Sequence, residues 1–109
     1  MIIVKNKKIK YGSKALESEF GPLTFGKLLT SHRLAEEISQ TELAKKLKMT
    51  RQKLNDFENG RRSPSLNLVS KIANSLGEHA PTWIAVVIEE MLRNENLNYT
   101  VNLKISSAA

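Results

Sequence analysis

The sequence contains no cysteine, and among its 109 residues only three are proline and six are aromatic. A chain without cysteine has no disulfide framework, no thiol nucleophile and no Cys-based zinc site. Long apolar runs are also missing, since none approaches the roughly 18 residues that a membrane-spanning helix needs. The first residues lack the basic-then-apolar order of a signal peptide. These absences predict a cytoplasmic protein that has no membrane partner.

Groups suited to catalysis are scarce. The two histidines, His32 and His79, lie far apart in the sequence and lack the spacing of metal ligands. The neighbouring glutamates at 36–37 and at 89–90 would point in different directions on a helix. The sequence has no glycine-rich phosphate loop and no nucleophile motif, so we expect no enzyme, no metal and no cofactor. His32 falls on an apolar stripe, which favours a structural role for it.

Positive charge is concentrated in two blocks. Residues 1–14 carry five lysines and no acidic residue, and residues 45–62 carry seven basic side chains against Asp56 and Glu58. Between the blocks, residues 15–44 have a net charge of −3. Such blocks indicate a surface that faces a polyanion, although a lysine run alone is more often a solvated face.

Apolar residues recur at helical spacing in five segments. Each of the first four segments follows a serine or threonine that can cap a helix. Ser39, with Glu42 three residues later, has the spacing of a capping box. Gly60 and Gly77 suit the left-handed position that follows a helix. The five segments begin after Thr24, Ser39, Thr50 and Ser65, and at Pro81.

The two ends of the chain show strand patterns instead. Residues 2–4 and 9–11 flank a polar turn, which predicts a short β-hairpin. Near the other end, apolar residues alternate with polar ones, which is typical of a strand with one buried face. The alternating apolar residues are Tyr99, Val101, Leu103 and Ile105.

The segment 50–58 has two distinct faces in helical projection. Leu54 and Phe57 point toward the preceding helix, and polar side chains point the other way. Arginine can bond O6 and N7 of guanine, glutamine and asparagine can bond N6 and N7 of adenine, and aspartate can accept from N4 of cytosine. A short helix with such a row near its N-terminus fits the major groove of DNA. The polar row consists of Arg51, Gln52, Asn55 and Asp56.

The preceding helix would cross this one and contact the DNA backbone. Gln40 stands at its start, where free amides can hold a phosphate, and Ala44 is small enough for a close crossing. Further phosphate contacts could come from Lys45, Lys46, Arg61 and Arg62. A four-helix bundle with a polar outer face would also explain the apolar stripes, but not two short helices joined by a two-residue turn.

The middle of the chain resembles the Cro/C1-type helix-turn-helix family, also called the Xre family. Several fixed spacings agree with that family at once, over roughly residues 23–77. The matching residues are Ser39-Gln40-Thr41-Glu42-Leu43-Ala44-Lys45-Lys46-Leu47, Met49-Thr50-Arg51, Phe57-Glu58-Asn59-Gly60-Arg61-Arg62, Pro64-Ser65, Lys71-Ile72-Ala73 and Leu76-Gly77. The resemblance implies a mainly α, five-helix, lambda-repressor-like domain. It also implies a regulator of transcription that binds double-stranded DNA as a homodimer and represses from a palindromic operator.

The resemblance also implies roles for single residues. The start of the third helix reads bases in this family, which adds Thr50 to the polar row. An arginine of the first helix pairs with the glutamate that ends the third, which implies a structural ion pair between Arg33 and Glu58. The resemblance implies phosphate contacts from Gln40, Asn59 and Arg61. With the neighbouring basic side chains, the predicted phosphate contacts are Gln40, Lys45, Lys53, Asn59, Arg61 and Arg62.

One position departs from the family's pattern. The turn between the second and third helices usually contains glycine, and this chain has Lys48 there. A side chain in a left-handed conformation costs about 1 kcal/mol or more. We therefore expect the turn to be strained or slightly different.

The rest of the chain is predicted to mediate dimerisation or partner binding. We expect a basic arm or hairpin over 1–20, the helix-turn-helix domain over 21–78, and a C-terminal helix and strand over 79–109. The strand could pair with its copy or with the hairpin, and the fifth helix could instead complete the core of one monomer. The candidate interface residues are Trp83, Val87, Met91, Tyr99, Val101 and Leu103.

Three other functions fit the same features less closely. Small helix-turn-helix proteins with terminal extensions are similar to antitoxins of toxin-antitoxin modules, which would make a toxin protein the second partner. Related domains also act as protein-bridging scaffolds or bind RNA. Outward-facing aromatic residues would support RNA binding, and here the few aromatic residues lie mostly on apolar stripes.

Overall fold

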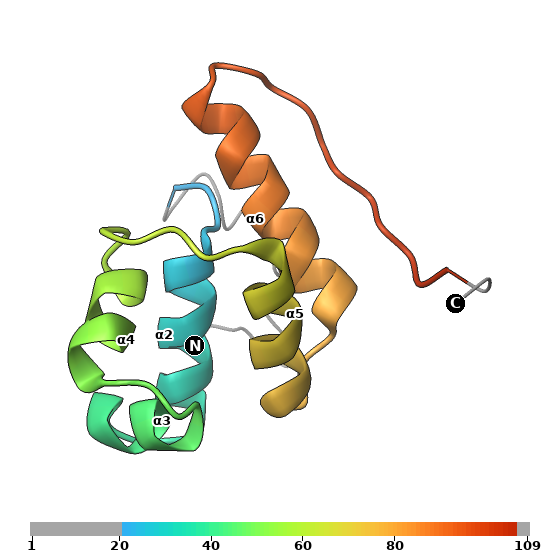
Figure 1. Cartoon of the computed structure of the whole chain (residues 1–109). Coiled ribbons are helices and arrows are strands. Elements are labelled where there is room, and N and C mark those ends of the chain that lie inside the picture. Colours follow the sequence, from blue (N-terminus) through green and yellow to red (C-terminus); the bar gives the residue numbers. More distant parts are fainter. Residues whose placement is uncertain (1–20, 107–109) are drawn as a thin grey trace, which may run out of the picture.

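The computed structural model describes residues 21–106, which form five α-helices joined by short connections (Figure 1). The mainly helical fold predicted from the sequence is confirmed. The arm and hairpin predicted over 1–20 lie outside the described residues. The helices are α2 (Phe25–Ala35), α3 (Gln40–Lys46), α4 (Arg51–Glu58), α5 (Leu66–Ser75) and α6 (Ala80–Asn94).

A hydroxyl side chain caps each of the helices α2 to α5, as predicted. In every case the side-chain oxygen accepts a hydrogen bond from the amide three residues later. Ser39 and Glu42 form the full capping box, because the Ser39 amide also donates to Glu42 Oε1 at 2.8 Å. A cap of this kind contributes about 1 kcal/mol, so local sequence sets where these helices begin. The capping residues are Thr24, Ser39, Thr50 and Ser65.

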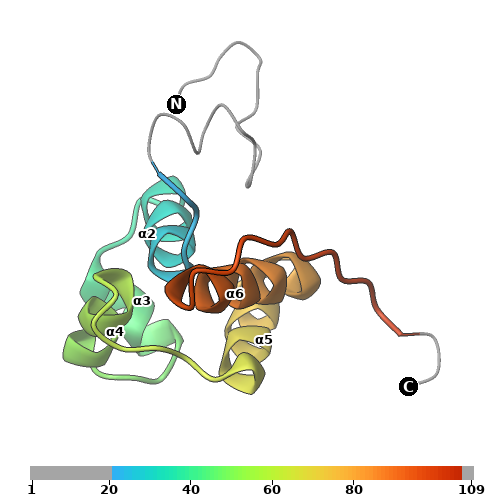
Figure 2. The same ribbon diagram turned by 90° about the horizontal axis from the view of Figure 1, so that it is seen from above.

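Helix α2 lies at the centre of the domain. It contacts α4 on one side and α6 on the other, while α3 packs on α4 and α5 packs on α6 (Figure 1, Figure 2). The two helices of the helix-turn-helix thus form one layer against α2, and α5 and α6 form the opposite layer. This arrangement leaves the outer side of α3 and α4 open to solvent.

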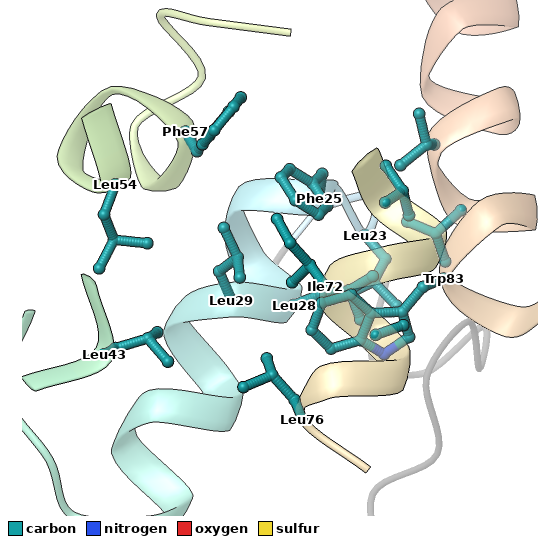
Figure 3. Close-up of a cluster of buried hydrophobic side chains, with 14 of the residues drawn as sticks. Leu23, Phe25, Leu28, Leu29, Leu43, Leu54, Phe57, Ile72, Leu76 and Trp83 are labelled. Carbon is teal, nitrogen blue, oxygen red and sulfur yellow. The ribbon is translucent and has the colours of Figure 1, made fainter. Parts of the chain in front are cut away.

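A continuous hydrophobic core joins the two layers (Figure 3). The Phe25 ring stands edge-on to both Phe57, with ring centroids 5.5 Å apart, and Trp83, at 6.1 Å. Such aromatic pairs add about 0.5–1.5 kcal/mol to the burial of their area. The buried apolar residues are Leu23, Phe25, Leu28, Leu29, Leu43, Ala44, Leu54, Phe57, Val69, Ile72, Ala73, Leu76, Trp83, Val86 and Val87.

At Gly26, helix α2 lies directly against the backbone at the end of α4. A methyl group at this position would lie 2.5 Å from the carbonyl oxygen of Glu58 and 2.7 Å from that of Phe57. Both oxygens belong to the backbone, so neither can turn away. The absence of a side chain at Gly26 therefore allows the C-terminal end of α4 to rest directly on α2.

Helix α6 completes the core of the single chain, and two residues predicted for a dimer or partner interface are buried within it. Trp83 is 1% exposed and Val87 is 2% exposed, so this part of the interface prediction is wrong. The physical reason is that α5 and α2 already cover the apolar stripe of α6. Met91, on the last turns of the same helix, remains 43% exposed.

The C-terminal segment that follows α6 is drawn out and contains no strand, so the predicted β-strand is wrong for the single chain (Figure 1). A strand requires a ladder of backbone hydrogen bonds to a second strand, and no segment within residues 21–106 pairs with it. The Val101 amide instead donates to Glu89 Oε2 at 2.7 Å. A groove of about 670 Å³ lies between this segment and α6. The expected buried face is also missing, because Tyr99 is 67% exposed and Ile105 is 77% exposed.

Candidate DNA-binding surface

The turn between α3 and α4 contains the lysine that replaces glycine. Lys48 has φ 58°, which is the left-handed conformation expected for this position. Its amide donates to the Lys45 carbonyl at 3.1 Å, and the Met49 amide donates to the Ala44 carbonyl at 2.9 Å. These two bonds form a Schellman motif, which satisfies the last carbonyls of α3. The turn thus keeps the geometry that glycine would allow, at the cost of a side chain in a left-handed conformation.

The face of α4 that points away from the core contains the predicted base-reading residues. Thr50, Arg51 and Gln52 are exposed, and Asn55 and Asp56 are half-buried along the same helix. On the opposite face, Leu54 is fully buried and Phe57 is 2% exposed. The two faces predicted from helical projection are therefore present.

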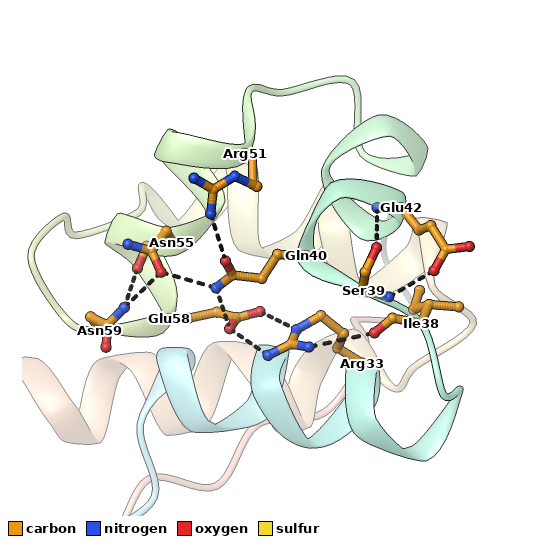
Figure 4. Close-up of polar contacts among 9 residues, drawn as sticks. All are labelled: Arg33, Ile38, Ser39, Gln40, Glu42, Arg51, Asn55, Glu58 and Asn59. Atoms are coloured by element: carbon orange, nitrogen blue, oxygen red, sulfur yellow. Dashed lines mark hydrogen bonds and ion pairs between the residues drawn. The ribbon is translucent and has the colours of Figure 1, made fainter.

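Gln40 lies at the centre of a polar network between α3 and α4 (Figure 4). Its Nε2 donates to Asn55 Oδ1 and to Glu58 Oε1, both at 3.0 Å, and its Oε1 accepts from Arg51 Nη1 at 3.2 Å. Asn59 Nδ2 donates to the Asn55 side chain at 3.0 Å. Since a glutamine amide has only two hydrogens, both donors of Gln40 are used inside the protein. This side chain therefore links α3 to the start and the end of α4.

The network continues into an ion pair between Arg33 and Glu58, because Glu58 also accepts from Gln40. Arg33 Nε donates to Glu58 Oε2 at 2.9 Å, and its Nη2 donates to Glu58 Oε1 at 3.1 Å. The Arg33 and Glu58 side chains are only 17% and 5% exposed. Two parallel bonds of this kind fix the relative orientation of the partners, so the pair ties α2 to the C-terminal end of α4.

A second set of bonds joins Asp56 to two of its neighbours. Gln52 Nε2 donates to Asp56 Oδ1 at 3.0 Å, and Arg61 Nε donates to the same oxygen at 3.1 Å. The Arg61 backbone amide also donates to the Asp56 carbonyl at 2.8 Å. Gly60, with φ 75°, makes this return of the chain possible. The sequence did not predict the pairing with Arg61, because nothing in the spacing distinguishes it from Arg51 or Arg62.

The remaining predicted phosphate contacts lie around the same two helices. Lys45, Arg61 and Arg62 are exposed, as is Asn59 at the end of α4, and Lys53 is half-buried. The Arg62 guanidinium lies 6.0 Å from the centre of the Phe57 ring, a cation–π distance. The structure thus brings the predicted base-reading and phosphate-contacting residues onto α3, α4 and the loop that follows α4.

His32 is confirmed as a structural residue. It is 5% exposed, and its Nδ1 lies 2.7 Å from Glu78 Oε2. This contact joins α2 to the connection between α5 and α6. The Nε2 atom of His32 is buried and has no hydrogen-bond partner within the described residues.

None of the helices within residues 21–106 combines the length and the apolar character required to cross a membrane. In the same range, no three acidic or histidine side chains gather closely enough to hold a metal ion.

Comparison with known proteins places this surface in a family. A helix-turn-helix family model matches residues 31–83. An uncharacterized HTH-type transcriptional regulator of Methanothermobacter thermautotrophicus is 45% identical over 53 residues, which cover 48% of this chain and 77% of that protein. The chain belongs to the Xre-type helix-turn-helix family. Members of this family are DNA-binding regulators of transcription.

Two further similarities support the family and the fold. The ImmF control region 10 kDa protein of Bacillus phage phi105 is 46% identical over 48 residues, or 44% of this chain. The matched part spans only about half of the phage protein, 53% of its length. A hypothetical transcription factor from Neisseria, NHTF, shares the fold with a TM-score of 0.51 and 24% identity, over 64% of this chain and 79% of that one.

Proposed function

We propose that this regulator reads a specific DNA sequence by inserting α4 into the major groove. The observation that carries the proposal is the exposed polar face of α4, which the Gln40 network and the Arg33–Glu58 pair hold in a fixed orientation. Preorganised side chains lose less entropy when they bind. The base contacts come from Thr50, Arg51, Gln52 and Asn55.

The residues around α4 contact the DNA backbone and set its register. Lys45, Lys53 and Arg62 supply charge, and Arg61 and Asn59 follow α4 at the edge of the groove. Gln40 exchanges one of its internal hydrogen bonds for a phosphate oxygen when DNA binds. Contacts to phosphates carry no sequence information but position the reading helix.

Dimerisation uses the C-terminal segment over 97–106. Of its alternating apolar residues, Tyr99, Leu103 and Ile105 are exposed in the single chain, whereas Val101 is half-buried. In an extended chain the amides of neighbouring residues point to opposite sides, so those of Thr100 and Asn102 face away from the Glu89 carboxylate that holds Val101. Pairing the edge formed by the Thr100 and Asn102 amides with the same edge of a second copy would form a two-stranded ribbon and bury the apolar side chains. The two reading helices would then meet half-sites about 34 Å apart, one turn of DNA.

Repression follows when such a dimer occupies a site that overlaps a promoter. The phage relative is named for a control region, which supports a role in gene control. A reporter gene with the selected site placed over its promoter should lose expression when the full chain is supplied. The Arg51→Ala variant should restore expression, and a rise in expression with the wild-type chain would contradict repression.

Selection from a random duplex library tests the reading function. The wild-type chain should enrich one palindromic motif and bind it at least about a thousandfold more tightly than random DNA. Gln52→Ala should lose about 1–3 kcal/mol on that motif and relax one base position in each half-site. Arg62→Ala is the control, because loss of a phosphate contact should weaken all duplexes alike. Equal affinity for enriched and random duplexes would exclude sequence-specific reading.

Binding of a toxin is the second candidate, and it depends on the same exposed C-terminal segment. The oligomeric state of the purified chain separates the two uses of that segment. A stable dimer through this segment would leave the segment unavailable to a toxin. A monomer that purifies with the product of a neighbouring gene would favour the antitoxin function.

A further inference from the structure

Asp56 is the single aspartate of the chain, and its contacts differ from those of a base-reading residue. Its Oδ1 accepts hydrogen bonds from Gln52 Nε2 at 3.0 Å and from Arg61 Nε at 3.1 Å. Gln52 belongs to the polar face of α4 that we propose reads bases. Arg61 follows α4 and belongs to the group that we propose contacts phosphates. One carboxylate therefore connects the two kinds of contact.

The geometry leaves both partners free to bind DNA. Glutamine has two amide hydrogens, so Gln52 can donate one to Asp56 and keep the other, together with its oxygen, for N7 and N6 of adenine. Arg61 uses Nε for the ion pair, which leaves its two terminal nitrogens for a phosphate. The Arg61 side chain is 56% exposed, whereas Asp56 is 21% exposed. The Asp56 carboxylate is thus less exposed to solvent than the Arg61 side chain that would meet the DNA.

The backbone holds the same arrangement. Gly60 has φ 75°, a left-handed conformation, and the Arg61 amide donates to the Asp56 carbonyl at 2.8 Å. This turn brings Arg61 back over the last turn of α4, where its side chain reaches Asp56. Arg62, the next residue, lies over the Phe57 ring instead. The two neighbouring arginines are therefore held by different partners, which makes Arg62 a matched control for Arg61.

From this geometry we infer that Asp56 is a positioning residue that sets sequence specificity, because it fixes Gln52 and Arg61 relative to each other. The inference rests on the proposed function and replaces the base contact expected for Asp56. A carboxylate that faced phosphates without a partner would repel DNA. Here its charge is compensated by Arg61, and its effect is to align a base contact with a backbone contact.

The Asp56→Ala variant should lose affinity for the enriched duplex but not for random duplex. Affinity for the duplex enriched by the wild-type chain should fall about tenfold, the loss expected for a misplaced base contact. Affinity for random duplex of the same length should not fall, because a negative charge has been removed from the binding face. A purely structural defect would lower both affinities together. Thermal unfolding should change little, since exposed pairs contribute little to stability.

A double-mutant cycle on the enriched duplex tests whether Asp56 acts together with Arg61. Asp56→Ala and Arg61→Ala should be non-additive, with a coupling of about fivefold, as residues in direct contact generally are. Asp56→Ala and Arg62→Ala should be additive. Asp56→Asn should keep the base preference at the Gln52 position, because its amide oxygen still accepts from Gln52. Its coupling with Arg61 should weaken, because the oxygen that accepts from Arg61 Nε no longer carries a negative charge.

Three results separate the inference from its alternatives. If the wild-type chain enriches no motif, the proposed function fails and the inference fails with it. If a motif emerges but Asp56→Ala binds enriched and random duplexes as the wild type does, only the inference is overturned. It is also overturned if Asp56→Ala loses preference for cytosine at one position and is additive with Arg61→Ala, because Asp56 would then contact that base directly.

Discussion

At the residue scale, the surface depends on charged side chains held in constrained positions. Lys48 turns the chain between α3 and α4 with φ 58°. Arg33 neutralises Glu58, whose side chain is 5% exposed. Both residues act on the orientation of α4 without belonging to its reading face. Their substitution should therefore change stability first and DNA affinity as a consequence.

Lys48→Gly should raise stability. Glycine removes the cost, about 1 kcal/mol, of a side chain in a left-handed conformation. The greater conformational freedom of glycine in the unfolded chain reduces this gain in stability. We expect a net increase of a few tenths of a kcal/mol up to about 1 kcal/mol in urea unfolding. The control is Lys46→Gly within α3, which should lower stability by a similar amount. A loss of stability in Lys48→Gly would mean that the lysine side chain makes a compensating contact.

Arg33→Ala should lower stability by about 3–5 kcal/mol, because it leaves the buried Glu58 carboxylate without its cation. Arg33→Lys keeps the charge but not the two parallel bonds, so its loss should be intermediate. Urea unfolding followed by far-ultraviolet circular dichroism measures both. A loss below about 1 kcal/mol in Arg33→Ala, typical of exposed pairs, would contradict this account.

At the scale of elements, the position of α4 depends on how closely it approaches α2. The carbonyl oxygens of Phe57 and Glu58 occupy the space above Gly26. The same end of α4 carries Glu58 and is followed by Asn59 and Arg61. A shift of α4 away from α2 would therefore disturb the ion pair and the polar network together.

Gly26→Ala should destabilise the domain although alanine favours helix formation. The helical gain is at most about 1 kcal/mol, whereas overpacking against rigid backbone costs about 1–3 kcal/mol. The net loss should be accompanied by weaker DNA binding, because α4 must move. Thermal unfolding and a titration with the selected duplex measure the two effects. An increase in melting temperature would show that α2 and α4 can separate without cost.

At the scale of the whole molecule, the described chain forms one core and leaves most apolar side chains of its C-terminal segment exposed. Tyr99, Leu103 and Ile105 are exposed, and a groove of about 670 Å³ lies between the segment and α6. Glu89 holds the middle of the segment at Val101. The segment is therefore positioned along the molecule without being packed into it, which suits a role in pairing two copies.

Asn102→Pro should dissociate the proposed dimer. Proline keeps the chain extended but removes an amide that would face the partner strand. Asn102→Ala is the control, because it keeps the amide and should leave the dimer intact. Sedimentation equilibrium of both full-length variants gives the mass. If the Asn102→Pro variant remains a dimer at micromolar concentration, the two copies do not pair through the edge that contains the Asn102 amide.

The sequence by itself determined where helices α2 to α5 begin and which face of α4 is polar. Capping residues and left-handed glycines act over three or four residues, so Ser39, Thr50 and Gly60 predict local structure directly. The helical period separates Leu54 and Phe57 from the polar row in the same way.

Only the tertiary structure decided which apolar groups are buried within one chain and which polar groups pair. Trp83 and the residues of the C-terminal segment look alike in the sequence, since both lie on regular apolar patterns. Whether such a face meets another part of its own chain depends on residues far away in the sequence. The same holds for Asp56, which selects Arg61 because the Gly60 turn returns that arginine to it. Local patterns specify elements, whereas burial and pairing depend on how the elements meet in space.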